Sequence, residues 1–350
     1  MEVEASEGNA CTVALTTLGH DELFGNIRES KVRLAAPTCC IAVDAEEDFD
    51  WERPGNAVGY STDCMRNVVN LDEVTSAFSL RPAYLLTYPV LEDAVVVRIL
   101  RAQLERGKCE VGIQLHPWVT PPFDGMIAQA SYLGALDPGF EESKLVNLIA
   151  AFRTAFGFEP TLFRAGRYGL SRATPRLLER HGILVDTSLA PRTDFSGQGG
   201  PDFSNYDCDP FWFGADRPLL EVPLCRALVG WAGRLAPALY QSAAAAPFAR
   251  WRMQAVLSRM RCAERITLSP EGNDVRAMRR LLRARRAHGQ SVFTLSFHSS
   301  SLAPGRNPYV RDRAELHWFY DRLSAILDAM ARDGFVFSTL SALPRLLGGV

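Results

Sequence analysis

The sequence predicts an α/β fold: a distorted (β/α) barrel of about seven to eight parallel strands in a single domain. Two observations support this prediction. Short apolar segments alternate with helical patterns about eight times, an order that requires parallel pairing with right-handed crossovers. The apolar segments are also short and almost free of charge, as expected for strands that are buried on both faces of a closed barrel.

The expected elements begin after residue 37. Strands are expected at residues 39–44, 82–88, 110–115, 161–164, 183–187, 219–222, 265–268, 292–297 and 335–338. Helices, each ending at a glycine that can terminate an α-helix, are expected at residues 95–107, 143–157, 174–182, 275–289 and 313–334. Residues 190–217 show no regular pattern, and so long an irregular segment in a compact domain predicts a functional loop.

Residues 1–37 lack a clear period and are expected to form a loosely ordered leader, with the barrel in residues 38–350. The chain starts with an acidic segment where a signal peptide would be basic, and no apolar stretch is long enough to span a bilayer. The eight cysteines include no CxxC pair, which favours reduced, buried thiols. We therefore expect a cytoplasmic protein without a transmembrane segment. The formal net charge of −2 gives no indication of a nucleic-acid partner.

Polar side chains follow most of the expected strands. The carboxyl ends of parallel strands meet at one mouth of a barrel, where active sites of this architecture lie. The residues at these positions are Asp44, Glu46, His116, Arg164, Arg167, Tyr168, Asp186, Glu221, Glu271 and His298. Carboxylates, imidazoles and guanidiniums at the same position of successive units predict an active site at that mouth.

Other charged residues are expected to be structural. The acids that follow Glu46, namely Glu47, Asp48, Asp50 and Glu52, are each interpreted as solvated or ion-paired. The arginine-rich helix 275–289 is interpreted as a solvated outer face rather than a polyanion-binding surface. The other histidines lie in the leader or on helices and are interpreted as structural; they are His20, His181, His288 and His317.

Five segments together resemble the polysaccharide deacetylases, the carbohydrate esterases built on the NodB-homology barrel, and in particular their WalW-like branch. They are VDAEEDFDW, EVGIQLHPWVTPPF, FRAGRYG, DTSLAPRTDFS and LSFHSSSLAPGRNPYV, and they occur in this order after successive expected strands. The resemblance covers about residues 38–347. It implies a distorted (β/α) barrel and metal-assisted hydrolysis of an N-acetyl or O-acetyl group on a sugar.

The resemblance also implies catalytic roles for residues of this chain. Asp44 would be the general base and His298 the general acid. Arg164 would orient the base, with Arg167 as the alternative, and the backbone N–H of Tyr168 would bind the oxyanion. Asp186 would hold the catalytic imidazole.

A divalent metal is implied as well, with zinc expected and cobalt or nickel as alternatives. Its expected ligands are Glu46 and His116, with Asp48 as an alternative to Glu46. The family usually supplies two histidines from its second motif, but Gln114 and Thr120 stand where a second histidine would be expected. Neither is a good zinc ligand, so the site could be weak, could recruit an acid, or could be empty.

Substrate contacts are expected from aromatic and polar residues near the same mouth. The aromatic candidates for stacking on a sugar are Trp118, Phe123, Trp212 and Phe213, and the polar candidates are Arg167, Arg192, Asp194 and Glu271. The predicted function is removal of acetyl groups from an amino sugar of an exopolysaccharide, a glycolipid or a precursor. Two alternatives remain: a non-catalytic carbohydrate-binding barrel with a decayed metal site, and a hydrolase of cyclic amides or ureides. The sequence does not indicate an oligomeric state.

Overall fold

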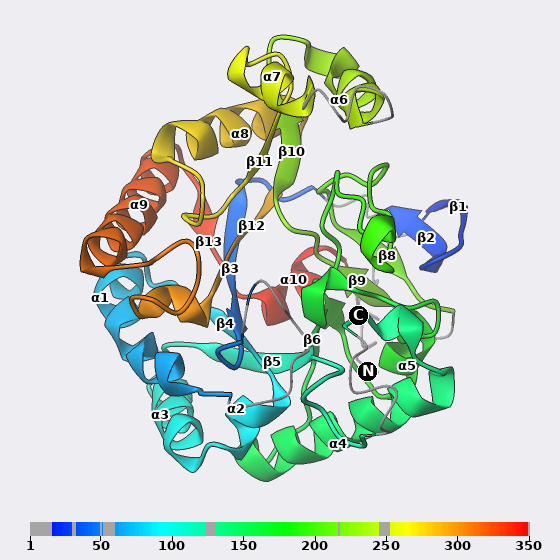
Figure 1. The fold of residues 1–350 in the computed structure, drawn as a ribbon, viewed down its shortest axis with the longest axis vertical. Helices are drawn as coiled ribbons and strands as arrows, with labels where there is room; N and C mark the ends of the chain where they lie inside the picture. Colours follow the sequence, from blue (N-terminus) through cyan, green and yellow to red (C-terminus); the bar gives the residue numbers. More distant parts are fainter. Residues whose placement is uncertain are drawn as a thin grey trace, which may run out of the picture.

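A ring of seven parallel strands forms the centre of the molecule in the computed structural model, which describes residues 16–29, 33–49, 51, 60–123, 131–215, 218–244 and 253–348 (Figure 1). The strands, in their order around the ring, are β12 (Val292–His298), β3 (Thr38–Ala45), β4 (Ala83–Leu86), β5 (Glu110–Leu115), β6 (Leu162–Ala165), β7 (Val185–Asp186) and β9 (Leu219–Glu221). Each pair of neighbours is parallel. The expected distorted barrel of parallel strands is confirmed.

The ring is closed by a hairpin rather than by an eighth parallel strand. β10 (Arg226–Val229) and β11 (Glu264–Thr267) pair antiparallel with each other. Leu268 N donates to Cys225 O at 2.8 Å, which extends the hairpin by one residue pair, and Ser296 N donates to Leu268 O at 3.1 Å, which connects the hairpin to β12. The expected strand at residues 265–268 therefore forms, but the expectation that it is a parallel barrel strand is wrong.

Strands outside the ring extend the sheet beyond β9. β9 pairs antiparallel with β8 (Phe211–Phe213), β8 with β2 (Gly25–Glu29), and β2 with β1 (Thr16–Asp21). No strand was predicted from the sequence in residues 16–29 or 190–217, but β1 and β2 lie in the first range and β8 in the second. A short strand, β13 (Val336–Phe337), pairs parallel with β3.

Helices surround the ring in Figure 1, and all five expected ones are present. The described helices are α1 (Asp72–Thr75), α2 (Tyr88–Glu92), α3 (Ala94–Glu105), α4 (Pro138–Phe156), α5 (Thr174–Arg180), α6 (Ala236–Ala244), α7 (Met253–Arg259), α8 (Val275–Ala287), α9 (Arg313–Arg332) and α10 (Leu343–Leu346). Aspartate side chains cap the starts of α3, α8 and α9 by accepting hydrogen bonds from backbone N–H groups of the first turn. α6 and α7 lie beyond the β10–β11 hairpin, outside the ring.

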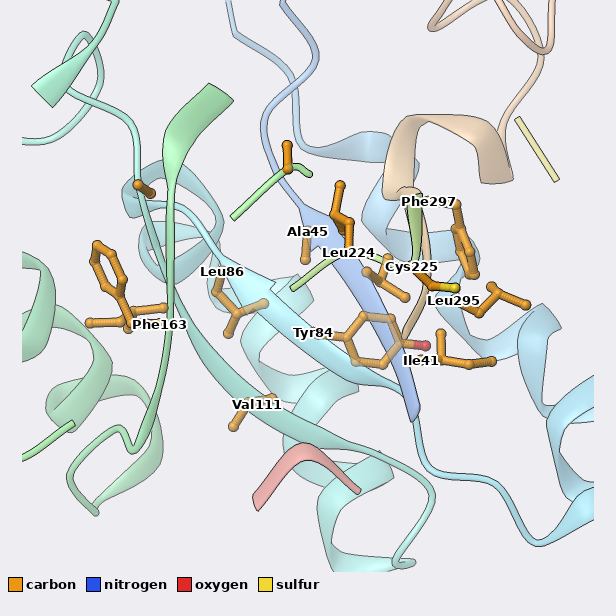
Figure 2. Close-up of a cluster of buried hydrophobic side chains, with 14 of the residues drawn as sticks. Ile41, Ala45, Tyr84, Leu86, Val111, Phe163, Leu224, Cys225, Leu295 and Phe297 are labelled. Carbon is orange, nitrogen blue, oxygen red and sulfur yellow. The ribbon is translucent and has the colours of Figure 1, made fainter. Parts of the chain in front are cut away.

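The two faces of the strands carry separate apolar clusters. Side chains such as Ile41, Tyr84, Leu86, Phe163 and Leu295 pack on the face toward the surrounding helices, as Figure 2 shows. The opposite face, which we call the lumen face, carries Cys40, Ala42, Ala83, Leu85, Leu162, Val185 and Leu220, and Leu343 of α10 packs among them. Because side chains alternate along a strand, the residues that continue the lumen face at the carboxyl ends are fixed by register.

The described residues contain seven cysteines, all of them buried and none in a disulfide. In the same residues, no helix is both long and apolar enough to cross a bilayer.

Candidate active site

Strand register brings the expected base and acid to one place. His298 and Asp44 are direct partners across β12 and β3, and Gln114 and Arg164 are partners across β5 and β6. Side chains alternate between the two faces of a strand, so Asp44, two residues after Ala42, lies on the lumen face. Arg164, two residues after Leu162, lies on the same face. These residues therefore form a polar layer above the apolar lumen.

A cavity of about 530 Å³ opens over this layer. Of the expected site residues, Asp44, Glu46, His116, Arg167, Tyr168, Glu271 and His298 line it. Arg164, although buried, reaches the same layer through its contact with Asp44. The volume lies within the range of small-molecule binding sites, roughly 300–1,000 Å³.

Arg164 compensates the charge of the buried Asp44. Its Nη1 donates to Asp44 Oδ1, and the two side chains are only 0% and 2% exposed. The guanidinium is fixed by further bonds, from Nε to the Thr187 carbonyl at 2.9 Å and from Nη2 to Thr187 Oγ1 at 3.0 Å. Asp44 Oδ2 is left facing the cavity, where an ionised carboxylate can accept a proton.

His298 lies across from Asp44 Oδ2. Its Nε2 is 3.4 Å from Asp44 Oδ2, and its Nδ1 is 2.8 Å from Glu271 Oε2. The other oxygen of Glu271 accepts bonds from the His298 backbone N–H, at 2.9 Å, and from Ser301 Oγ. Glu271, which was expected to contact substrate, is thus the residue that fixes the ring orientation of His298.

The role expected for Asp186, holding the imidazole, is wrong. Asp186 is in register with Phe163 and with Glu221, so it points to the helix-facing side of the sheet rather than the lumen face. There it accepts a hydrogen bond from Ser188 Oγ, while Glu221 accepts one from Leu189 N at 3.0 Å. Burial raises the pKa of Asp186 to about 6 and that of Glu221 well above its ordinary value.

The turn after β6 places Tyr168 at the cavity. Arg167 and Tyr168 both have left-handed backbone angles, with φ of 54° and 58°. The Tyr168 hydroxyl is 3.4 Å from Asp44 Oδ2, and burial raises its pKa, so it remains a proton donor at neutral pH. Gly166 begins this turn without a side chain because a Cβ would overlap the ring of His116. The role expected for the Tyr168 backbone N–H stays a prediction.

Both ring nitrogens of His116 lie near a glutamate. Its Nδ1 is 2.8 Å from Glu47 Oε1, which also accepts a bond from Trp118 Nε1 at 3.0 Å. Trp118 stacks on the His116 ring with centroids 4.2 Å apart and is 1% exposed. Trp118 is therefore a positioning residue in the core, and the expectation that it contacts substrate is wrong.

A metal was expected at Glu46 and His116. These two do converge, with His116 Nε2 3.4 Å from Glu46 Oε2, and the other oxygen of Glu46 is buried without a hydrogen-bond partner. Catalytic zinc sites, however, use three protein ligands. The described residues contain no group of three or more histidine, cysteine, aspartate or glutamate side chains that could hold a metal ion.

The alternative ligands do not complete the set. Asp48 lies 3.3 Å from Arg306 Nη1 and does not line the cavity. Gln114 lines the cavity with an unpartnered side-chain oxygen, and Thr120 is buried outside it. The donors that the structure describes thus do not fit a three-ligand centre, and the mechanism below uses no metal.

The remaining substrate candidates divide clearly. Arg167 lines the cavity, where its guanidinium lies 4.4 Å from the Tyr132 ring centroid. Arg192 and Asp194 do not line it, and their expected substrate contacts stay predictions: Arg192 pairs with Asp207 at 3.4 Å, and Asp194 Oδ1 accepts a bond from Ser196 N. Three aromatic candidates also lie elsewhere. Trp212 and Phe213 are buried in the core, and Phe123 is at the surface.

An aromatic wall that the sequence analysis did not assign covers the site. Trp51 meets the His298 ring edge-on at 4.8 Å and lies 5.8 Å from the Tyr309 ring, and Phe49 stacks on Trp51 at 5.2 Å. Both Trp51 and Tyr309 belong to segments quoted for the family resemblance. Their position within those motifs could have indicated a place in the site. Spacing along the sequence, however, does not show which aromatic side chain faces a cavity.

The glutamate beside His298 should control its titration. Burial lowers the pKa of His298, but Glu271, Glu46 and Asp44 raise it more, so the net change is from 6.5 to about 10. The charged imidazole thus contributes stability that is fully present below pH 6.5 and is lost as the pH rises through about 10. We expect E271Q to lower this pKa, as measured by NMR titration of the His298 ring protons. An unchanged titration would show that Glu271 does not set it.

Comparisons with known proteins support the fold. No protein-family model matches the chain, and no curated protein matches its sequence. Among solved structures, a protein of Mycobacterium smegmatis assigned as a polysaccharide deacetylase is 18% identical, with a TM-score of 0.53, over 91% of this chain and 93% of that one. PuuE allantoinase is 12% identical, with a TM-score of 0.50, over 88% of this chain and 89% of that one. The barrel fold is therefore shared with these proteins, whereas function must be argued from the site.

Proposed function

We propose that this chain is a hydrolase that removes acetyl groups from an amino sugar of an exopolysaccharide, a glycolipid or a precursor, as in the WalW-like branch of the polysaccharide deacetylases. The observation that carries the proposal is the pairing of Asp44 and His298 at 3.4 Å, at the mouth of the barrel, in one cavity. Each of the two has a partner that fixes it, Arg164 for Asp44 and Glu271 for His298.

The geometry assigns one proton transfer to Asp44 and one to His298. Asp44 Oδ2 takes a proton from water, and the water oxygen forms a bond to the acetyl carbon. His298, which is protonated at neutral pH, gives its Nε2 proton to the sugar nitrogen as the carbon–nitrogen bond breaks. Such an acid typically contributes a factor of about 10²–10⁴, and an amide needs it because an unprotonated amine leaves poorly.

Tyr168 would stabilise the oxyanion that forms on the acetyl carbonyl. Both its hydroxyl, beside Asp44, and its backbone N–H are candidate donors. Loss of one such donor costs a factor of about 10²–10³ in comparable sites. Trp51 and Tyr309 provide apolar faces on which a sugar ring can stack.

Chelation tests the mechanism without metal. We expect the purified protein to release acetate from acetylated amino sugars at the same rate with and without excess EDTA, because the described donors do not make a three-ligand site. Metal analysis of the same sample is the control. Activity that disappears with EDTA and returns with zinc, cobalt or nickel would show that a further ligand completes the site, and would overturn the mechanism.

The incomplete donor set favours a second candidate, a carbohydrate-binding barrel without catalysis. A binder would retain sugars in the cavity and release no acetate, with or without added metal. A screen of cyclic amides and ureides in the same assay separates the third possibility, a hydrolase with a different substrate.

A further inference from the structure

Two arginines on the β10–β11 hairpin line the cavity beside the proposed catalytic residues. Arg226 pairs with Thr267 in the hairpin register, and Arg265 lies two residues before Thr267 on the same strand. Because alternate residues share a face, Arg226 and Arg265 lie on the same face of the hairpin. Two positive charges are thus brought together on one wall of the site.

Neither guanidinium has a carboxylate partner among the residues that the structure describes. Arg226 donates from Nε to Thr267 Oγ1 and from Nη1 to Thr193 Oγ1, both at 2.8 Å, and Arg265 donates from Nη1 to the Arg192 carbonyl at 3.2 Å. These acceptors are all neutral. A guanidinium has five N–H donors, so several donors on each arginine remain for a ligand.

The two buried arginines of the described chain, in contrast, are neutralised. Arg164 pairs with Asp44, and Arg285 lies 2.9 Å from carboxylate oxygens of both Asp207 and Asp209. Two like charges on one wall of a cavity repel each other, and an anionic ligand would relieve that repulsion. The site's own carboxylates are paired with other side chains: Asp44 bonds Arg164, Glu271 bonds His298, and Glu46 lies 3.4 Å from His116.

We propose that Arg226 and Arg265 bind an anionic group of the substrate, a carboxylate or a phosphate, while the acetyl group lies at Asp44 and His298. Guanidiniums match the oxygens of both groups with paired hydrogen bonds. The substrate is then an acidic acetylated sugar rather than a neutral one. This inference rests on the proposed function for the position of the acetyl group. Beyond that function, the inference assigns recognition of the substrate's negative charge to the β10–β11 hairpin, which was not predicted from the sequence to belong to the site.

Direct binding of simple sugars tests the inference. The probes are glucose, glucose 6-phosphate and glucuronate, whose affinities for the unmodified protein are measured by calorimetry. We expect at least one anionic probe to bind about 10-fold or more tightly than glucose, since each charged hydrogen bond contributes about this factor. The stronger of the two anions identifies the group as phosphate or carboxylate.

Two variants and a control connect this preference to the hairpin. R226M and R265M are each expected to remove most of it, whereas R332M, at an exposed position in the last turn of α9, should retain it. R265M remains informative if loss of the threonine bonds prevents R226M from folding, because Arg265 is exposed. Equal affinity for the three probes, or a preference unchanged in the arginine variants, overturns the inference. The probes have no acetyl group, so their binding is measured independently of deacetylation. If the anionic probes bind as expected but acetylated amino sugars release no acetate, only the proposed function is contradicted.

Discussion

Replacement of His298 by alanine is expected to reduce acetate release by about 10²–10⁴-fold, the contribution of a positioned general acid. The imidazole is the group that can protonate the leaving nitrogen across the cavity from Asp44. The fold should survive, because the side chain lies at the cavity mouth and is 19% exposed. Glu271 also keeps its bonds from the residue 298 backbone N–H and from Ser301.

The matched control is H317A, which removes an exposed histidine of α9 whose Nδ1 lies 2.7 Å from the Arg313 carbonyl of the same helix. Both variants should melt within a few degrees of the unmodified protein, and only H298A should lose turnover. Acetate release by H298A at the unmodified rate would remove His298 from the mechanism.

The D44N variant is expected to fail in two ways. Turnover should be lost because an amide cannot accept the proton of the attacking water. Stability should fall by about 3–5 kcal/mol, because Arg164 would remain buried without its charge partner. Urea denaturation followed by circular dichroism measures the second effect, and acetate release measures the first.

Two further variants separate charge from packing in that result. E264Q breaks a half-buried ion pair with Arg280 at 2.8 Å and should cost no more than about 1 kcal/mol. D44N/R164M removes both charges, so we expect it to be more stable than the sum of its single variants predicts, yet still inactive. A D44N protein as stable as the unmodified chain would contradict the ion-pair argument.

The barrel was predictable because its signals are local and repeated. Apolar segments that alternate with glycine-terminated helices predict parallel strands, and the residues after those strands did converge at one mouth. Asp44, His116 and His298 were found this way, since each directly follows or ends a strand. The order of strand and helix, however, says nothing about how the ring closes. Strand β11 was therefore expected to be parallel although it forms a hairpin with β10.

The misassignment of Asp186 has a physical cause. A strand of two residues such as β7 does not reveal its register from composition, and a shift of one position moves a side chain to the opposite face. Asp186 was therefore assigned to the imidazole, whereas Glu271, from the loop after β11, holds it. The same limitation hid Arg226 and Arg265, whose shared face exists only once the hairpin is paired.

A crystal structure with a phosphonate analogue of the tetrahedral acetyl intermediate tests the central claim most directly. The account predicts phosphonate oxygens within hydrogen-bond reach, about 2.6–3.2 Å, of both the Asp44 carboxylate and His298 Nε2, with Trp51 and Tyr309 against the sugar. An analogue bound elsewhere, or held in the cavity without contact to either residue, would contradict it.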